Sequence, residues 1–173
     1  VLELPTIFNK VRKQYPNARL VLIGSDSYDI QTNSKSTWEL VEQEFESEDL
    51  KHVSYLGKIP YQEVQDYIKK ANVCVFPTFA ETLGMVTIES MALQKPVVNS
   101  NIGWAQELLV DGESGYLVHP KDYDEFSNKI VGLLKDDILC YTIGKAARIR
   151  IESVFDIEKI AEQNVDFYKS IIG

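Results

Sequence analysis

The sequence has few groups that would neutralise a nucleic acid. Its 173 residues include 18 lysines and arginines against 26 aspartates and glutamates, which gives a formal net charge of −8 at pH 7. Proteins that bind DNA or RNA rely on Lys and Arg to neutralise phosphates, so this balance argues against a nucleic acid partner. A single anionic ligand stays compatible with it, because salt screens distant charges over roughly 8 Å and a helix N-terminus acts at shorter range.

Cysteine is also scarce. The two cysteines, Cys74 and Cys140, match neither a zinc-site spacing nor a C-x-x-C redox motif. We therefore expect structural thiols in a reducing compartment. No apolar run reaches the length of a membrane span, and no signal-peptide pattern opens the sequence. These absences predict a cytoplasmic protein.

Common nucleotide-binding and metal-binding signatures are missing as well. Neither a G-x-G-x-x-G nor a Walker sequence occurs, which disfavours dehydrogenases and P-loop kinases. A D-x-D tripeptide, typical of metal-dependent sugar transferases, spans Asp122 to Asp124, but Glu125 follows Asp122 at capping-box spacing. We interpret Asp122 as a helix cap and expect no metal ligand there. The acidic run from Glu42 to Asp49 has no His or Cys beside it, and we interpret it as a solvated helix face.

Short apolar runs alternate with helical patterns along the whole chain. The runs interpreted as buried strands cover residues 18–24, 52–57, 73–77, 96–99 and 115–118. Helical spacing covers residues 1–15, 37–48, 60–71, 84–93, 105–110, 123–134, 139–152 and 157–171. The alternation predicts an α/β fold, with a doubly wound parallel sheet covered by helices on both faces.

The organisation along the chain predicts one domain. No repeat or low-complexity linker divides residues 1–173. The sequence opens in a helical pattern that has no N-cap signal and no strand before it. We therefore expect the first strand of the sheet to lie upstream, in a longer protein of which residues 1–173 are a part.

The stretch FPTFAETLGMVTIESMALQKPVV, residues 76–98, places two glutamates around a glycine at a strand-to-helix turn. Gly84 is expected in the first helical turn, where backbone N–H groups have no intrahelical partner. Glu81 precedes that helix and Glu89 lies inside it. The free N–H groups of Gly84 and of the two residues after it, Met85 and Val86, suit a diphosphate.

The arrangement suits a nucleotide sugar. Glu89 would accept hydrogen bonds from the ribose hydroxyls of the nucleotide, and Glu81 would reach the sugar. The alternative is that Glu81 caps the helix and Glu89 is an exposed helix residue, and the spacing alone leaves both interpretations open. Gly24, at the end of an apolar run, is likewise either a turn glycine or a point where a ligand approaches the backbone.

The stretch ETLGMVTIESMALQKPVV resembles the motif of two glutamates separated by seven residues in retaining glycosyltransferases of the GT-B fold, especially family four (glycosyl transferases group 1). The segments LVLIG, VSYLGKIPYQEVQDYIKKANVCVFPT and NIGWAQELLVDGESGYLVHPKDYDEF match the C-terminal, donor-binding domain of that family in the same order. The resemblance covers most of residues 1–170. It implies the Rossmann-like half of a GT-B fold, without the N-terminal acceptor domain.

The resemblance also implies roles for single residues. Glu81 binds the donor hexose next to the reacting atoms, as a positioning group and not as a nucleophile, and Glu89 binds the ribose. The loop with Lys58 and Ile59 holds the base. The complete set of donor-binding residues is Gly24, Lys58, Ile59, Leu83, Gly84, Met85, Val86 and Glu89.

By resemblance, the full protein transfers a hexose from a UDP- or GDP-hexose to a glycan or lipid-linked acceptor, with retention of configuration and with neither metal nor cofactor. Surface polysaccharide or glycoconjugate synthesis, at the inner face of the membrane, is the implied setting. The isolated chain is expected to be inactive, because the Arg and Lys that clamp the diphosphate in this family have no match here. Gln94 also departs from the family, which often has Gly there. The alternatives are a GT-B sugar-nucleotide epimerase and a nucleotide-binding module without catalysis.

Overall fold

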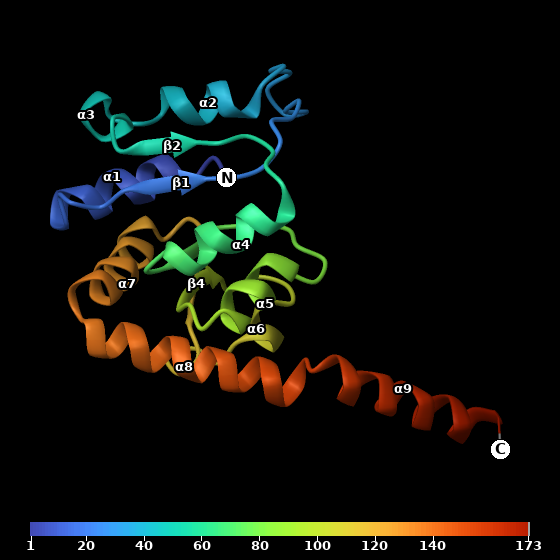
Figure 1. Cartoon of the computed structure of the whole chain (residues 1–173). Coiled ribbons are helices and arrows are strands. Elements are labelled where there is room, and N and C mark those ends of the chain that lie inside the picture. The colour runs from blue at the N-terminus through green and yellow to red at the C-terminus, as the bar shows by residue number, and fades with distance from the viewer. Residues whose placement is uncertain (173) are drawn as a thin grey trace.

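Five of the apolar segments form short strands in the computed structural model, which describes residues 1–172 (Figure 1). They are β1 (Leu20–Leu22), β2 (Val53–Tyr55), β3 (Cys74–Phe76), β4 (Val97–Ser100) and β5 (Tyr116–Val118). All strand pairs are parallel, and they form a two-stranded sheet, β1-β2, and a three-stranded sheet in the order β3-β4-β5. The predicted α/β fold with parallel strands is confirmed. Within residues 1–172, however, no ladder joins β1 to β3.

The helices lie between and after the strands, as the apolar spacing predicts. Their bounds are α1 (Leu4–Gln14), α2 (Thr37–Gln43), α3 (Ser47–Leu50), α4 (Tyr61–Lys70), α5 (Met85–Ala92), α6 (Ala105–Leu108), α7 (Tyr123–Lys135), α8 (Asp137–Val154) and α9 (Ile157–Ile172). The interpretation of Asp122 as a cap is confirmed, because its carboxylate accepts the backbone N–H of Glu125 at the start of α7.

Both faces of the three-stranded sheet are buried. Successive residues of β4 point to opposite faces, so Val97 and Val98 lie on different sides of the sheet. Val98 packs into an apolar cluster with Phe126 and Ile130 of α7 and with side chains of α1. Val97 packs on the other face, with Met91 of α5 and with side chains of α8. A strand buried on both faces is typical of a doubly wound fold.

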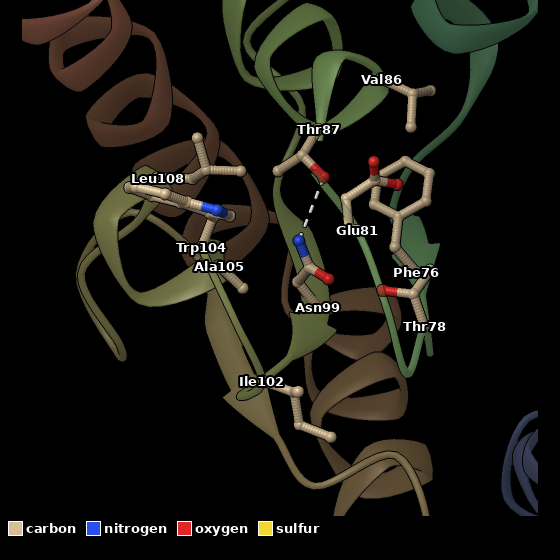
Figure 2. A pocket seen from close by; sticks show the side chains of 10 residues that line it. All are labelled: Phe76, Thr78, Glu81, Val86, Thr87, Asn99, Ile102, Trp104, Ala105 and Leu108. Atoms are coloured by element: carbon tan, nitrogen blue, oxygen red, sulfur yellow. Dashed lines mark hydrogen bonds between the residues drawn. The ribbon is translucent and has the colours of Figure 1, made fainter. Parts of the chain in front are cut away.

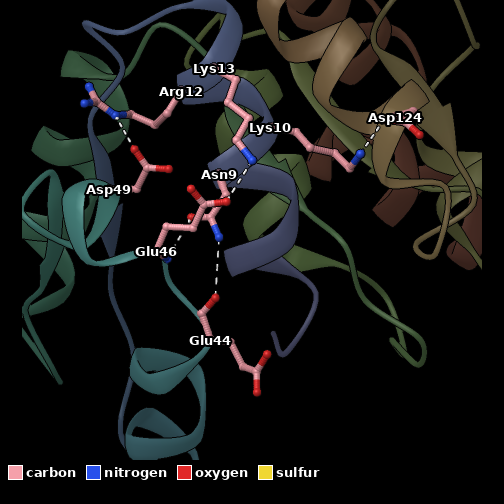
Figure 3. A network of polar contacts seen from close by, with 8 residues as sticks. All are labelled: Asn9, Lys10, Arg12, Lys13, Glu44, Glu46, Asp49 and Asp124. Atoms are coloured by element: carbon pink, nitrogen blue, oxygen red, sulfur yellow. Dashed lines mark hydrogen bonds and ion pairs between the residues drawn. The ribbon is translucent and has the colours of Figure 1, made fainter.

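The expected helix over residues 37–48 is broken into α2 and α3, and the cause is Asn9 on α1 (Figure 3). The Asn9 side chain donates to the carbonyl of Glu44 and accepts the N–H of Glu46, so these backbone groups are bound by α1 instead of by a continuous helix. Glu46 accordingly has an extended conformation, with φ −62° and ψ 138°. A side chain distant in sequence thus decides the local structure.

The interpretation of the whole acidic run as a solvated face is wrong for Asp49. Its carboxylate is buried and lies 3.0 Å from Nε of Arg12 on α1 (Figure 3). Glu46 forms a more exposed ion pair with Lys13, also on α1. Part of the acidic run therefore attaches α3 to the body of the protein.

The last helix, α9, extends away from the other elements (Figure 1). It contains no buried residue, although its sequence has an apolar stripe that includes Ile160 and Phe167. None of the helices within residues 1–172 combines the length and the apolar composition needed to cross a lipid bilayer.

Candidate functional site

Because the strands are parallel, the loops that follow β1, β2, β3 and β4 all leave the sheets at their carboxyl edge. Gly24 lies there beside Gly57, the residue before Lys58. The N–H of Gly24 donates to the carbonyl of Gly57 over 3.0 Å, and the Tyr55 hydroxyl donates to the carbonyl of Gly24 over 2.9 Å. The loop after β1 is thus joined to the loop that carries Lys58 and Ile59.

Gly84 lies at the start of α5, where its surroundings require a glycine. It is the N-cap residue in the left-handed conformation, with φ +71°, and an added Cβ would lie 2.8 Å from Cδ1 of Leu108. Helix α5 begins at Met85, one residue later than the sequence pattern predicts. The backbone N–H groups of Met85 and Val86 have no acceptor inside the helix, whereas the N–H of Thr87 donates to the carbonyl of Gly84 over 2.9 Å. Leu83, Met85 and Val86 are exposed around this helix start.

Glu81 lies in the loop between β3 and α5. Its carboxylate accepts the backbone N–H of Thr82 over 3.0 Å, and α5 has no side-chain cap. The alternative that Glu81 caps the helix is therefore wrong. The loop hydrogen bond holds the exposed carboxylate beside Gly84.

Glu89 lies in the second turn of α5 and is half-buried. Its Oε1 accepts a hydrogen bond of 2.8 Å from the hydroxyl of Tyr61, the first residue of α4. The alternative of a simply exposed helix residue does not describe this carboxylate. Tyr61 follows the loop of Lys58 and Ile59, so this contact brings the two predicted regions together.

A small pocket opens beside Glu81 (Figure 2). Thr87 and Asn99 lie between Glu81 on one side and Trp104 on the other, and the Asn99 amide donates to the Thr87 hydroxyl over 3.0 Å. Thr87 and Asn99 are buried, whereas Trp104 is half exposed. The complete lining is Phe76, Thr78, Glu81, Val86, Thr87, Asn99, Ile102, Trp104, Ala105 and Leu108. The pocket combines an apolar wall with polar groups, as small-molecule sites do.

Several of these residues were missed from the sequence. Asn99 carried a usable signal, because it is a polar residue at the carboxyl end of the apolar run Val97–Ser100. Trp104 directly follows Gly103, which has a left-handed φ of 63°. Nothing in the local sequence marks Tyr61, whose role depends on a residue of another helix. Of the predicted residues, Glu81 and Val86 line the pocket, Leu83, Gly84 and Met85 lie between them in the chain, and Gly24, Lys58 and Ile59 are not part of the lining.

The loop after β1 is organised by Asp26. Its carboxylate accepts hydrogen bonds from the Ser36 hydroxyl and from the backbone N–H of Trp38. These bonds favour the charged form and lower the pKa of Asp26 below its ordinary value.

Elsewhere, burial raises the pKa of the Cys74 thiol. Among residues 1–172, no three or more His, Cys, Asp or Glu side chains gather in a way that would hold a metal ion.

Comparison with known proteins agrees with this geometry. The family described as glycosyl transferases group 1 matches residues 3–150. The capsular polysaccharide biosynthesis glycosyltransferase CapM of Staphylococcus aureus is 36% identical over 106 residues, which are 61% of this chain and 28% of CapM. The chain thus spans less than a third of that relative.

Solved structures give the same picture. The C-terminal domain of LpcC, a glycosyl transferase group 1 family protein from Francisella tularensis, superposes with a TM-score of 0.78 at 25% identity, over 90% of this chain and 79% of that domain. Anabaena HepE, solved in complex with UDP-glucose, matches with a TM-score of 0.78 at 23% identity, over 95% of this chain and 44% of HepE. The likeness to HepE shows the fold alone.

Proposed function

The chain belongs to the glycosyl transferases group 1 family, and from this membership we propose that residues 1–173 bind the nucleotide-sugar donor of a retaining hexosyltransferase. The observation that carries the proposal is the helix start at Gly84. There Gly84 is a left-handed N-cap, and the N–H groups of Met85 and Val86 after it have no acceptor inside the helix, with Glu81 before them and Glu89 one turn beyond.

The donor is placed by three kinds of contact. Its diphosphate accepts hydrogen bonds from the backbone of Gly84, Met85 and Val86 and lies at the positive end of α5. Its ribose hydroxyls donate to Glu89, and its hexose donates to Glu81 in the adjoining pocket. The base lies against the loop of Lys58 and Ile59, and a ligand-bound structure with the base far from this loop would contradict its placement.

The chemistry follows from where charge moves. When the glycosidic bond to the diphosphate breaks, negative charge grows on the phosphate oxygens and the sugar becomes oxocarbenium-like. The N-terminus of α5 stabilises the departing diphosphate, so the proposed transfer needs no metal ion. Glu81 holds the hexose with its anomeric carbon toward the acceptor. The acceptor hydroxyl oxygen bonds to that carbon, its proton passes to the departing diphosphate, and the product keeps the configuration of the donor.

The identity of the donor and the setting are proposed from relatives. HepE was solved with UDP-glucose, which makes a UDP-hexose the first candidate. CapM acts in capsular polysaccharide biosynthesis, which supports a glycan or lipid-linked acceptor for the protein that contains this chain. The Arg and Lys that clamp the diphosphate in this family have no match in residues 1–173, so this chain alone should bind UDP more weakly than about 1 µM. The acceptor site is proposed to lie outside these residues, so the chain alone should transfer no sugar. Micromolar or tighter binding in calorimetry would overturn that part.

The decisive experiment uses the full-length protein that contains these residues. Glu81→Gln should lower turnover far more than it weakens binding of UDP, because UDP lacks the hexose that Glu81 holds. Glu113→Gln, in the exposed turn before β5 at the opposite edge of the sheet, is the matched control and should change neither quantity. A chelator should leave activity intact. An inverted product, or activity that chelation abolishes and manganese restores, would contradict the proposal.

A further inference from the structure

The contact between Tyr61 and Glu89 has no evident purpose in holding the fold together. It joins α4 to α5 at the surface, where Tyr61 is 53% exposed and Glu89 is half-buried. A single hydrogen bond between side chains in water adds little net stability. Its main effect is geometric, because it fixes where the carboxylate of Glu89 points.

We propose that Tyr61 is a positioning residue that holds the Glu89 carboxylate in the orientation that binds the ribose hydroxyls of the donor. This inference rests on the proposed function, in which Glu89 is the ribose ligand. A free glutamate side chain loses rotamer freedom when it binds a ligand, and that loss weakens binding. A carboxylate that is already held by Tyr61 has lost much of this freedom before the ligand arrives.

Tyr61 is well placed to hold another side chain. It is the first residue of α4, directly after Pro60, whose φ of −58° fixes the backbone at the helix start. A tyrosine has only two side-chain torsions, so ordering its hydroxyl loses less entropy than ordering a lysine or arginine would. The hydroxyl therefore projects from a backbone that is restricted on both sides.

The contact also leaves Glu89 able to bind. An ionised carboxylate offers about four lone-pair positions, and the Tyr61 hydroxyl occupies one of them on Oε1. The ribose 2′ and 3′ hydroxyls need two more. Within the part of the chain that the structure describes, no Lys or Arg forms an ion pair with Glu89. A neutral hydroxyl orients the carboxylate without replacing the ligand, as a strong ion pair would.

The test compares UDP with 2′,3′-dideoxy-UDP on the full-length protein. Glu89→Gln should weaken UDP by about 10- to 100-fold and leave the dideoxy analogue nearly unchanged. Tyr61→Phe keeps the ring and removes only the hydroxyl. It should weaken UDP by about three- to tenfold, again without effect on the dideoxy analogue. In the steady state this variant should raise KM for the donor and leave kcat unchanged.

Two controls separate positioning from other roles. Tyr67→Phe, on the same helix, should change neither affinity. In a double-mutant cycle, Tyr61→Phe added to Glu89→Gln should not weaken UDP further. The carboxylate that Tyr61 orients is already absent from the Glu89→Gln variant. Thermal denaturation of each variant checks that the fold is kept.

The outcomes distinguish this inference from the proposed function. If Glu89→Gln weakens only UDP while Tyr61→Phe weakens both ligands equally, or neither, the role of Tyr61 is overturned and that of Glu89 stands. If Glu89→Gln weakens both ligands equally, or neither, Glu89 does not bind the ribose. In that case the proposed function loses its ribose contact, and the inference about Tyr61 fails with it.

Discussion

The two sheets of this chain are held in different ways. Around β3, β4 and β5, stability comes from close apolar packing: all four residues of β4 are buried, and Gly144 of α8 lies directly against the backbone of Gln94. Around β1 and β2, Leu20, Leu22 and Val53 also pack against an apolar cluster, but Val21 is 44% exposed and polar side chains join the loops and α3 to the rest. Steric changes should therefore be most damaging in the first region, and loss of polar partners should be most damaging in the second.

The polar connections of the β1–β2 region have named partners. Arg12 on α1 pairs with Asp49 of α3, and Asp26 organises the loop before α2. Trp38 stacks on Tyr55 with ring centroids 4.5 Å apart, and the Tyr55 hydroxyl holds Gly24. The proposed diphosphate and hexose contacts thus belong to the packed region, whereas the proposed base contacts adjoin the polar one.

The largest effect is expected for Gly144→Ala in the packed region. A Cβ there would overlap the carbonyl oxygen of Gln94, and backbone on both sides prevents an easy shift. We expect the free energy of unfolding to fall by about 3 kcal/mol, as for severe overpacking, measured by chemical denaturation. Gly132→Ala in α7 is the control, since nothing lies within 4 Å of its Cβ. Gly132→Ala should raise the free energy of unfolding by about 0.5–1 kcal/mol, because alanine has the higher helix propensity. Equal effects of Gly144→Ala and Gly132→Ala would contradict the steric explanation.

The next effect tests the polar region through Arg12→Met. The change leaves the carboxylate of Asp49 without its cation, and the two side chains are only 12% and 11% exposed. We expect a loss of about 2 kcal/mol in the free energy of unfolding, below the value for a fully buried pair. Adding Asp49→Leu should recover much of that loss, because no uncompensated charge is left. Lys13→Met, which breaks the exposed pair with Glu46, is the control and should have little effect.

Gln94→Gly should produce a smaller change, and in the opposite direction. Gln94 has a φ of 60°, which disfavours a residue with a Cβ, and the family often has Gly at this turn. After subtraction of the greater chain entropy of glycine, we expect a gain of about 0.5 kcal/mol by chemical denaturation. Asn33→Gly in the polar region, at φ 57°, should give no gain, because asparagine tolerates this conformation and accepts a bond from Tyr28. A matching gain at both positions would contradict the reasoning.

The smallest effect concerns the pH response of the loop after β1. The folded pKa of Asp26 lies below its ordinary value of 3.8, so its hydrogen bonds stabilise the fold at pH values above 3.8. That contribution is lost as the pH falls through the lowered folded pKa. Amide NMR shifts of Trp38 should therefore follow the titration of Asp26 in this acidic range. Asp26→Asn should remove the response, and an unchanged titration curve would refute the assignment.

The sequence predicted most of the packed region because local patterns decide it. Apolar runs and glycines marked β3, β4 and the turn before α5, and the family motif indicated Glu81 and Glu89. The contacts of Asn9 and Tyr61 were missed for one physical reason, because both join segments that are distant in the sequence. Asn9 breaks a helix that begins 28 residues later, at Thr37. The partner of Glu89, Tyr61, comes from a different helix. The strand expected upstream stays a prediction. It is compatible with the absence, among the described residues, of a hydrogen-bonded ladder between β1 and β3.

Helix α9 has a consequence for how the chain unfolds. Its 16 residues have helical geometry without burial, so only local hydrogen bonds and propensity support them. A helix of this length is marginal in water, and it exchanges with coil independently of the core. On heating, the far-ultraviolet ellipticity should therefore slope steadily as α9 frays. The near-ultraviolet signal of Trp38 and Trp104 should stay level until the rest of the chain melts, so the two spectral regions will not report one common transition.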